Sequence, residues 1–373
     1  MKKQAQWCDA ASPFFHHFGS LMTLVFSLVT ITLYANNGEP EWIERKKNIT
    51  FSYNISSSDK ISLDNQFGDI KVNFWDKNEV KVEVTIVANA TSEERASNFM
   101  KTVDVVGKKL DGQVSIKTVI DRNEGNYNNN TWKSKSADNE KNSLTIDYQV
   151  FMPKNNALKI KNSFGNTFLP TCTNVLTVHQ SYGKLVAEDI ANAQSEISLQ
   201  FCKNSYIKSM TGGTLKASYS GIKMENADNL TFNNSFGDID IKEVGKIDAK
   251  ISYSSGIIGL IRESSDLKLE FSNGFKLGGI GKNVKELGIN ASYSPVSITL
   301  HDGVLYDFEV KANYGNFSYP DGGVSFSKNT DIEAKQSDRY HYTSTKYYEG
   351  KIGKGSATCK IIVNGNFSNV KFK

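Results

Sequence analysis

The feature that most constrains this chain is a short phrase that recurs between residues 158 and 317. Each copy has an alternating apolar run, usually Ser or Asn, an aromatic residue, a small residue and a second alternating run. The aromatic residues are 17 to 22 positions apart. They are Phe164, Tyr182, Phe201, Tyr219, Phe236, Tyr253, Phe271, Tyr293 and Tyr314, with weaker copies at Phe201 and Phe271. A unit this short cannot bury its apolar side chains alone, so the copies are expected to stack.

Hydrophobic periodicity predicts that each copy contains two short strands. The residue four positions before the aromatic is apolar in every copy, and polar residues mostly alternate with the apolar ones, as in a strand with one buried face. In five copies, apolar residues stand three and five positions after the aromatic, so the alternation changes phase and the chain must bend. Gly165 and Gly183 lie at this bend, where freedom at positive φ or close backbone approach is useful.

Stacked copies of this kind predict an all-β fold, a right-handed parallel β-helix (β-solenoid) of short repeats over residues 158–319. The nine aromatic residues are expected to be structural and to form an internal stack, with burial of each ring contributing about 2–3 kcal/mol. A twisted antiparallel meander or sandwich is the alternative, since it also uses short alternating strands. The constant spacing favours the β-solenoid.

The segments on either side predict covers for the two ends of the stack. Residues 36–157 are expected to form a β-rich capping module, with strands 114–120 and 144–152 as a pair and residues 122–142 as a loop. Its Thr91-Ser92-Glu93-Glu94 run is a capping box that predicts a helix near 92–103. Residues 320–373 are expected to form a loop, over 331–350, and a closing coil around Phe367.

The N-terminus predicts export. An uncharged, largely apolar run at 21–34 follows Lys2 and Lys3 and precedes Ala35, which indicates a signal peptide over residues 1–35. Retention of this segment as an N-terminal anchor is the alternative. The mature chain is expected to lack a transmembrane span and to reside in the periplasm, on the outer-membrane surface or outside the cell.

Cysteine usage and charge exclude several classes of site. Cys8 would leave with the leader, while Cys172, Cys202 and Cys359 show no paired spacing for zinc or redox chemistry and are expected to be free, buried thiols. The formal net charge is only +4, which is too balanced for nucleic-acid binding.

Catalytic chemistry has no convincing signature in the sequence. Asp238 and Asp240 alternate on one strand and are expected to form a solvated face, and His301-Asp302 is expected to be a turn. No nucleophile elbow, phosphate loop, zinc motif or repeated calcium phrase occurs. The sequence therefore predicts a non-enzymatic protein with no catalytic residues, no metal ligands and no cofactor.

Several phrases carry a family resemblance. They are Phe-Trp-Asp-Lys-Asn-Glu-Val-Lys-Val at 74–82, Tyr-Gln-Val-Phe-Met-Pro at 148–153, the recurrent Ser-Phe-Gly and Ser-Tyr-Gly, and the closing Ile-x-Val-x-Gly-x-Phe. Together they resemble a bacterial β-strand-repeat family of unknown function, related to auto-transporter adhesin head domains of Bacteroidetes. The resemblance implies a right-handed parallel β-helix, an exported envelope protein and an adhesin role. It supplies no catalytic residues.

Three functions follow from these expectations. The first is an exported adhesin or binding protein for a glycan or an envelope protein, which solvent-facing aromatic residues clustered on one face would support. The second is a periplasmic structural or regulatory scaffold without a small-molecule ligand, for which a uniformly polar surface would argue. The third is a polysaccharide-active enzyme, which would need a groove of converging carboxylates. The oligomeric state and the identity of the ligand stay open.

Overall fold

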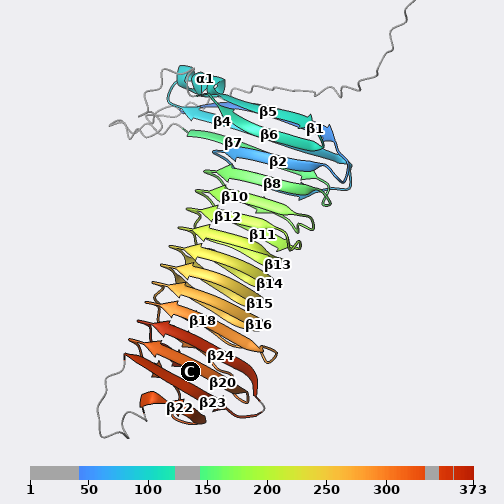
Figure 1. Cartoon of the computed structure of the whole chain (residues 1–373). Coiled ribbons are helices and arrows are strands. Elements are labelled where there is room, and N and C mark those ends of the chain that lie inside the picture. The colour runs from blue at the N-terminus through green and yellow to red at the C-terminus, as the bar shows by residue number, and fades with distance from the viewer. Residues whose placement is uncertain (1–41, 122–142, 332–343, 356) are drawn as a thin grey trace, which may run out of the picture.

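The computed structural model describes residues 42–121, 143–331, 344–355 and 357–373, which form 25 strands and the helix α1. The strands stack along the long axis of an elongated body (Figure 1). They belong to one large sheet that is not closed within the described residues. The fold is therefore almost entirely β, as predicted. The predicted signal peptide and the loop at 122–142 lie outside the described residues.

One run of paired strands extends along the whole body, and we call it the aromatic-side ladder because most of its strands end just before a repeat aromatic residue. It is parallel from β6 to β20 and antiparallel at its two ends. In spatial order its strands are β5 (Val103–Leu110), β6 (Gln113–Ile120), β2 (Lys60–Gln66), β8 (Ala157–Ser163), β10 (Leu176–Ser181), β12 (Glu196–Gln200), β13 (Ser205–Ser218), β14 (Ile222–Ser235), β15 (Asp238–Ser252), β16 (Ser255–Glu270), β18 (Glu286–Ser292), β24 (Ala357–Asn366), β20 (Leu305–Asn313), β23 (Thr345–Gly353) and β22 (Val324–Asn329).

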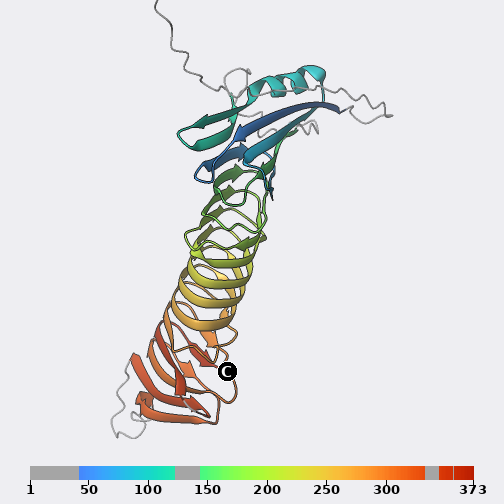
Figure 2. The ribbon, with the colours of Figure 1, turned by 90° about the vertical axis from the view of Figure 1, so that its right-hand side faces the viewer.

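The second ladder begins with antiparallel strands and is parallel thereafter. It contains β1 (Ile43–Asn54), β4 (Glu79–Ala90), β7 (Ser143–Met152), β3 (Ile70–Phe74), β9 (Thr167–Leu169), β11 (Leu185–Ile190), the long strands β13 to β16, then β17 (Phe275–Leu277), β19 (Val296–Ile298), β25 (Val370–Phe372) and β21 (Phe317–Ser318). Because β13 to β16 pair in both ladders, the two share one continuous hydrophobic core. Figure 2 shows these long strands curving from one face of the body to the other.

The core consists of the apolar columns that the periodicity predicted. The residues four positions before each aromatic are buried and lie in register from strand to strand, for example Leu215 beside Phe232. After the bend, Ile222 and Ile239 continue the buried pattern on the other side. Each buried column thus places one side chain per strand against its neighbours, which is how the stack removes apolar surface from water.

Both ends of the aromatic-side ladder contain a strand inserted out of chain order. β2 lies between β6 and β8, and β24 lies between β18 and β20. The predicted closing coil therefore does follow the repeat pattern, but its strand β24 lies between β18 and β20 and not after the last strand of the repeat. The predicted pairing of 114–120 with 144–152 is wrong, since β6 pairs with β5 and β2, whereas β7 pairs with β4 and β3.

The predicted helix is confirmed as α1 (Glu93–Thr102). Ser92 is its N-cap and accepts a hydrogen bond from the backbone N–H of Arg95. The predicted loop at 331–350 is only partly correct: 332–343 lies outside the described residues, and β23 already begins at Thr345. No helix in the described residues is long and apolar enough to cross a membrane.

The three described cysteines are free and buried, as expected. Burial raises the pKa of Cys172 to about 12 and that of Cys359 to about 11, from an ordinary value of 9.0. Burial likewise raises the pKa of Cys202. None of these thiols is therefore poised as a reactive thiolate at neutral pH.

These shifts predict a loss of stability at alkaline pH. Below about pH 9, both the folded and the unfolded chains hold the thiol protons. As the pH rises toward 11 and 12, the unfolded chain releases protons that the folded chain keeps, so the free energy of unfolding falls. Urea titrations from pH 8 to 11 should show this fall, and a Cys172→Ser/Cys359→Ser variant should show a shallower one. Equal slopes would contradict the prediction.

Candidate functional site

A continuous row of stacked aromatic side chains runs along one edge of the aromatic-side ladder, and we call it the aromatic ladder. Adjacent ring centroids are 4.7 to 5.2 Å apart and the ring planes are within 14° of parallel. In spatial order its members are Phe67, Phe164, Tyr182, Phe201, Tyr219, Phe236, Tyr253, Phe271, Tyr293, Phe367 and Tyr314. All nine predicted aromatic residues are thus brought together in one row.

The row lies on the surface, so the prediction of an internal stack is wrong. From Phe164 to Tyr314, the exposed fractions range from 38% to 54%. The physical reason is the backbone at the bend, where every ladder residue has φ between 46° and 62°. Simple alternation would place these side chains inward with the residues two and four positions earlier. The left-handed conformation instead turns them outward, and the next residue points inward.

Backbone hydrogen bonds join the bends of neighbouring strands. The amide of Phe164 donates to the carbonyl of Ser181 (2.9 Å), and that of Tyr219 donates to Ser235 (2.9 Å). The same bond recurs at every ladder residue, and ends where Tyr314 donates to Ser344 (2.7 Å). Because each bend is held at the spacing of hydrogen-bonded strands, about 4.8 Å, the rings are held in contact as well.

Glycine after the aromatic serves close backbone approach and not positive φ. A Cβ on Gly165 would lie 1.9 Å from the carbonyl oxygen of Gly68, and one on Gly183 would lie 1.8 Å from that of Gly165. The coils that contain these glycines have Asn or Gln two positions before the aromatic. The amide of Gln180, for example, donates to the carbonyl of Gly165 at 2.7 Å.

Other coils replace this arrangement with a buried serine. Ser272 Oγ accepts from the amide of Ser254 (3.3 Å) and donates to the carbonyl of Glu270 (3.0 Å). Ser294 and Ser368 continue the row, with amide-to-Oγ distances of 2.9 Å. Both kinds of bend therefore place a side chain that hydrogen-bonds the backbone under the aromatic ladder, either an amide or a hydroxyl.

Cys202 occupies one of these serine positions, and this accounts for its departure from the repeat. Its thiol donates to the carbonyls of Gln200 and Gln180, both at 3.4 Å, and its amide donates to Ser220 Oγ (2.9 Å). We expect Cys202→Ser to change the free energy of unfolding by less than about 1 kcal/mol, because the hydroxyl can make the same bonds.

Cys202→Val is the matched variant, since it keeps the bulk and removes the polar atom. It should lower the free energy of unfolding by about 1–3 kcal/mol, because buried backbone groups lose a partner. Denaturant titration of the two variants beside the wild type gives the comparison. A more stable valine variant would show that the thiol acts only by packing.

Polar rows flank the aromatic ladder. In the strand that precedes each ring, the residue immediately before the ring is in most cases a half-buried serine. An exposed lysine often stands two positions before that residue. The hydroxyl row contains Ser163, Ser181, Ser218, Ser235, Ser252 and Ser292, and the lysine row contains Lys161, Lys216, Lys250, Lys268 and Lys311. Glu270 pairs with Lys268 at 3.0 Å, which lowers the pKa of this carboxyl group. The surface is thus an apolar ridge bordered by hydroxyls and then by positive charge.

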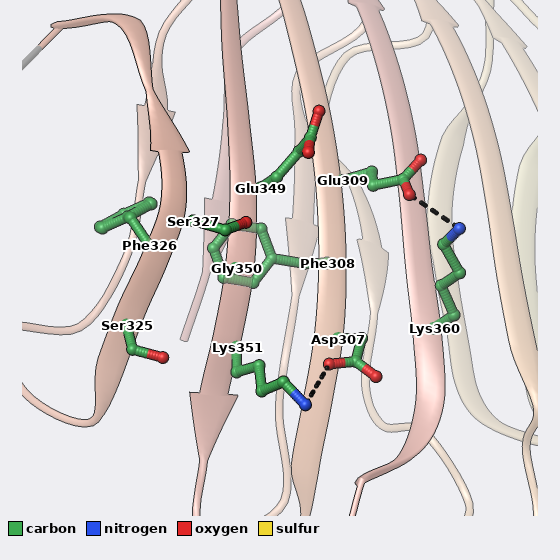
Figure 3. Close-up of a pocket in the computed structure, with 10 residues that line it drawn as sticks. All are labelled: Asp307, Phe308, Glu309, Ser325, Phe326, Ser327, Glu349, Gly350, Lys351 and Lys360. Atoms are coloured by element: carbon green, nitrogen blue, oxygen red, sulfur yellow. Dashed lines mark ion pairs between the residues drawn. The ribbon is translucent and has the colours of Figure 1, made fainter. Parts of the chain in front are cut away.

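Three carboxylates line each of two hollows. Asp248, Asp266 and Glu286 line one of about 590 Å³, and the other, of about 310 Å³, lies at the C-terminal end. Figure 3 shows Asp307, Glu309 and Glu349 around it, together with Phe308 beside Gly350. Asp307 pairs with Lys351 (3.3 Å) and Glu309 with Lys360 (2.7 Å). Two of the three carboxylates are thus neutralised by lysine, which is unlike the pair of acid and base that glycoside hydrolysis requires.

The other residues singled out in the sequence take structural places. Asp238 accepts a hydrogen bond from Ser255 Oγ (2.8 Å) on the outer face of β15, and the exposed His301 donates its amide to the Tyr306 hydroxyl (3.2 Å). In the described residues, no group of three His, Cys, Asp or Glu side chains could hold a metal ion.

Sequence reasoning missed two members of the aromatic ladder. Phe67 lies well ahead of the nine aligned copies, and Phe367 is predicted to belong to a closing coil but is not counted in the aromatic row. Val363 and Val370 do stand four before and three after Phe367, so the column pattern would have identified it.

Comparison with known proteins gives no family assignment. No protein-family model matches the chain, and no curated protein matches it. Five chains of solved structures match. A "putative adhesin" from Bacteroides fragilis is 11% identical, with a TM-score of 0.34, over 88% of this chain and 97% of that one. A "putative lipid binding protein" from Parabacteroides distasonis is 13% identical, with a TM-score of 0.34, over 87% and 97%. A "putative cell adhesion protein" from Clostridium sporogenes is 12% identical, with a TM-score of 0.18, over 88% and 100%.

Proposed function

We propose that this chain is an exported, non-enzymatic binding protein of the cell envelope, which acts as an adhesin by contacting a glycan or a protein through the aromatic ladder. The observation that carries the proposal is the exposure of the ladder. Its rings from Phe164 to Tyr314 are 38% to 54% exposed and form one contiguous row. Contiguous exposed apolar surface of this kind marks interaction sites.

This surface separates the three functions expected from the sequence. A scaffold without a ligand would be served by a uniformly polar exterior, but this exterior carries a clustered aromatic face. A polysaccharide-active enzyme would need converging, unpaired carboxylates, but Asp307 and Glu309 in the C-terminal hollow are paired with lysines. The binding role is therefore the one that the geometry favours.

We infer further that the paired ladders wind as a right-handed parallel β-solenoid over residues 158–319. Residues 36–157 would cap one end, residues 320–373 would close the other, and residues 1–35 would direct export. Parallel register from β6 to β20 supports the winding. Kinship with auto-transporter adhesin head domains belongs to the same proposal and rests on the sequence phrases alone.

Binding by the purified chain to arrays of defined glycans and defined extracellular proteins tests the proposal. The variant Tyr219→Asn/Phe236→Asn/Tyr253→Asn removes three central rings, and asparagine accepts positive φ readily. We expect it to lose at least tenfold in affinity for the partner found with the wild type. Tyr206→Asn, on an outer column away from the ladder, is the control and should bind normally.

Two results would contradict the proposal. One is a wild-type chain that binds nothing on either array. The other is binding that survives removal of the three rings. Location is tested separately: protease added to intact cells should remove a C-terminal tag if the chain is on the surface, and protection until lysis would place it in the periplasm.

A further inference from the structure

The aromatic ladder alternates between phenylalanine and tyrosine in space, although not in sequence. From Phe164 to Tyr314, ten rings follow one another as Phe, Tyr, Phe, Tyr without exception. In sequence Tyr293 is followed by Tyr314, and the insertion of β24 places Phe367 between them. The alternation is therefore completed by a strand from a distant part of the chain.

Because phenylalanine and tyrosine alternate, the same ring type recurs at every second strand along the row. Successive tyrosines are separated by two centroid steps of 4.7 to 5.1 Å each. Their hydroxyls thus recur at about 10 Å, twice the ~4.8 Å spacing of paired strands. An apolar phenylalanine edge lies between each pair of hydroxyls. A ligand that uses this row should itself have an extended, two-unit repeat.

The rings present their edges and not their faces. Because neighbouring planes are within 14° of parallel at these separations, each ring covers the face of the next, and the exposed half is the edge. The edge of an aromatic ring is its electropositive part. An oxygen-rich chain would therefore meet favourable charge along the row, whereas a second aromatic ladder packed edge against edge would not.

Local energetics also point to use of this surface. A bulky residue at positive φ is unfavourable by roughly 1–2 kcal/mol, and stacking returns only about 0.5–1.5 kcal/mol per pair. Glycine or asparagine would form the same bend with less strain. Strain repeated along one exposed row is the kind of outlier that indicates function.

The flanking rows add recognition for a hydroxylated polymer. Ser218 and Ser235 stand beside adjacent rings, with their hydroxyls 3.3 Å apart, and both are half-buried. The lysine row next to them would repel a second copy of the same face, since like charges would meet across the contact. Hydroxyls at the row and on its border suit a neutral or acidic glycan instead.

We propose that the aromatic ladder binds an extended β-1,4-linked glycan chain that lies along its length. In such a chain successive sugars are flipped, so the disaccharide is the repeat, and its length is close to two strands of the ladder. Each tyrosine hydroxyl would hydrogen-bond the same group of successive disaccharides, while phenylalanine edges contact the sugar between. This inference rests on the proposed binding function and names its ligand class.

Isothermal titration of the full chain with cellohexaose and chitohexaose tests the inference, with maltohexaose as the control of coiled geometry. We expect the chain to bind one of the two β-1,4-linked hexasaccharides. Its affinity for that hexasaccharide should be at least tenfold higher than its affinity for the corresponding disaccharide or for maltohexaose. Tyr219→Phe/Tyr253→Phe keeps every ring and should weaken binding about tenfold with an unchanged melting temperature.

The matched variant is Tyr219→Phe/Phe236→Tyr, which conserves the composition and the stack but breaks the alternation. It should also bind several-fold more weakly, and wild-type affinity in this variant would overturn the role of the repeat. Absence of binding to either β-1,4-linked probe at millimolar concentration, or equal binding of maltohexaose, would overturn the ligand class. Self-association of the wild type that this variant abolishes would assign the face to a second copy.

The outcomes distinguish this inference from the proposed function. If the array partner binds through the ladder while the β-1,4-linked probes do not, only the ligand class is wrong. If neither binds, the binding function falls with it.

Discussion

Gly183→Ala should lower the free energy of unfolding by about 3 kcal/mol, at the upper end of the effects of overpacking. The added Cβ would lie 1.8 Å from the carbonyl oxygen of Gly165, and this oxygen already accepts the hydrogen bond from Gln180. Relief requires the two bends to separate, which would also break the ring contact between Phe164 and Tyr182. Denaturant titration and near-ultraviolet circular dichroism should report both losses.

Gly221→Ala provides the matched control. Gly221 follows the bend at Tyr219, two bends along the ladder from Gly183. A Cβ there would lie 3.6 Å from its nearest neighbour, the amide nitrogen of Asn204. We expect a change within about 1 kcal/mol, since glycine-to-alanine exchange at a compatible site reduces the freedom of the unfolded chain. Equal effects of the two substitutions would show that close approach at Gly183 is not what limits this position.

The second large effect is expected from Val363→Asp in the inserted strand β24. Val363 is fully buried between Ile289 and Val310, and a lone carboxylate there has no partner. Burying an unpaired charge is unfavourable by several kcal/mol, so β24 should leave the stack. Hydrogen exchange should then speed up in β18, β20 and β24, while β8 to β13 stay protected.

Asn364→Asp, at the adjacent exposed position, introduces the same charge without burial. It gives up one hydrogen bond to Asn290 (3.0 Å) and should leave exchange in β18 and β20 nearly unchanged. Exchange that rises along the whole stack in Val363→Asp would contradict the local role of β24 and indicate a single cooperative unit.

Most strands could be predicted from the sequence, because period-two alternation and a fixed repeat spacing are local properties of the chain. Residues such as Leu215 and Ile239 were placed in the core by alternation alone, and both are buried. The capping box at Ser92 likewise fixed the start of α1. These features depend on neighbours a few positions away, which a sequence displays directly.

The site was harder to predict, because it depends on one torsion angle and on strand order. Counting by two places Tyr219 inward, and only its φ of 51° turns it out. The Phe–Tyr alternation depends on the place of β24, which no spacing in the repeat reveals. The outward direction of the rings and their alternation are both properties of the surface. There, burial no longer constrains the choice of residue, and long-range strand pairing determines which side chains are neighbours.

The inserted strand also has a kinetic consequence. β18 and β20 are separated by only a short stretch of chain, yet neither can complete its pairing until residues 357–366 are available. The strands of the aromatic-side ladder from β10 to β18 can pair successively as they are made, because each finds its partner in the preceding coil. The last rungs must wait for a long loop to close, and long-range closure slows folding. During that interval the edges of β18 and β20 lack the strand that will lie between them, so a partly synthesised chain would be most exposed to wrong pairing there.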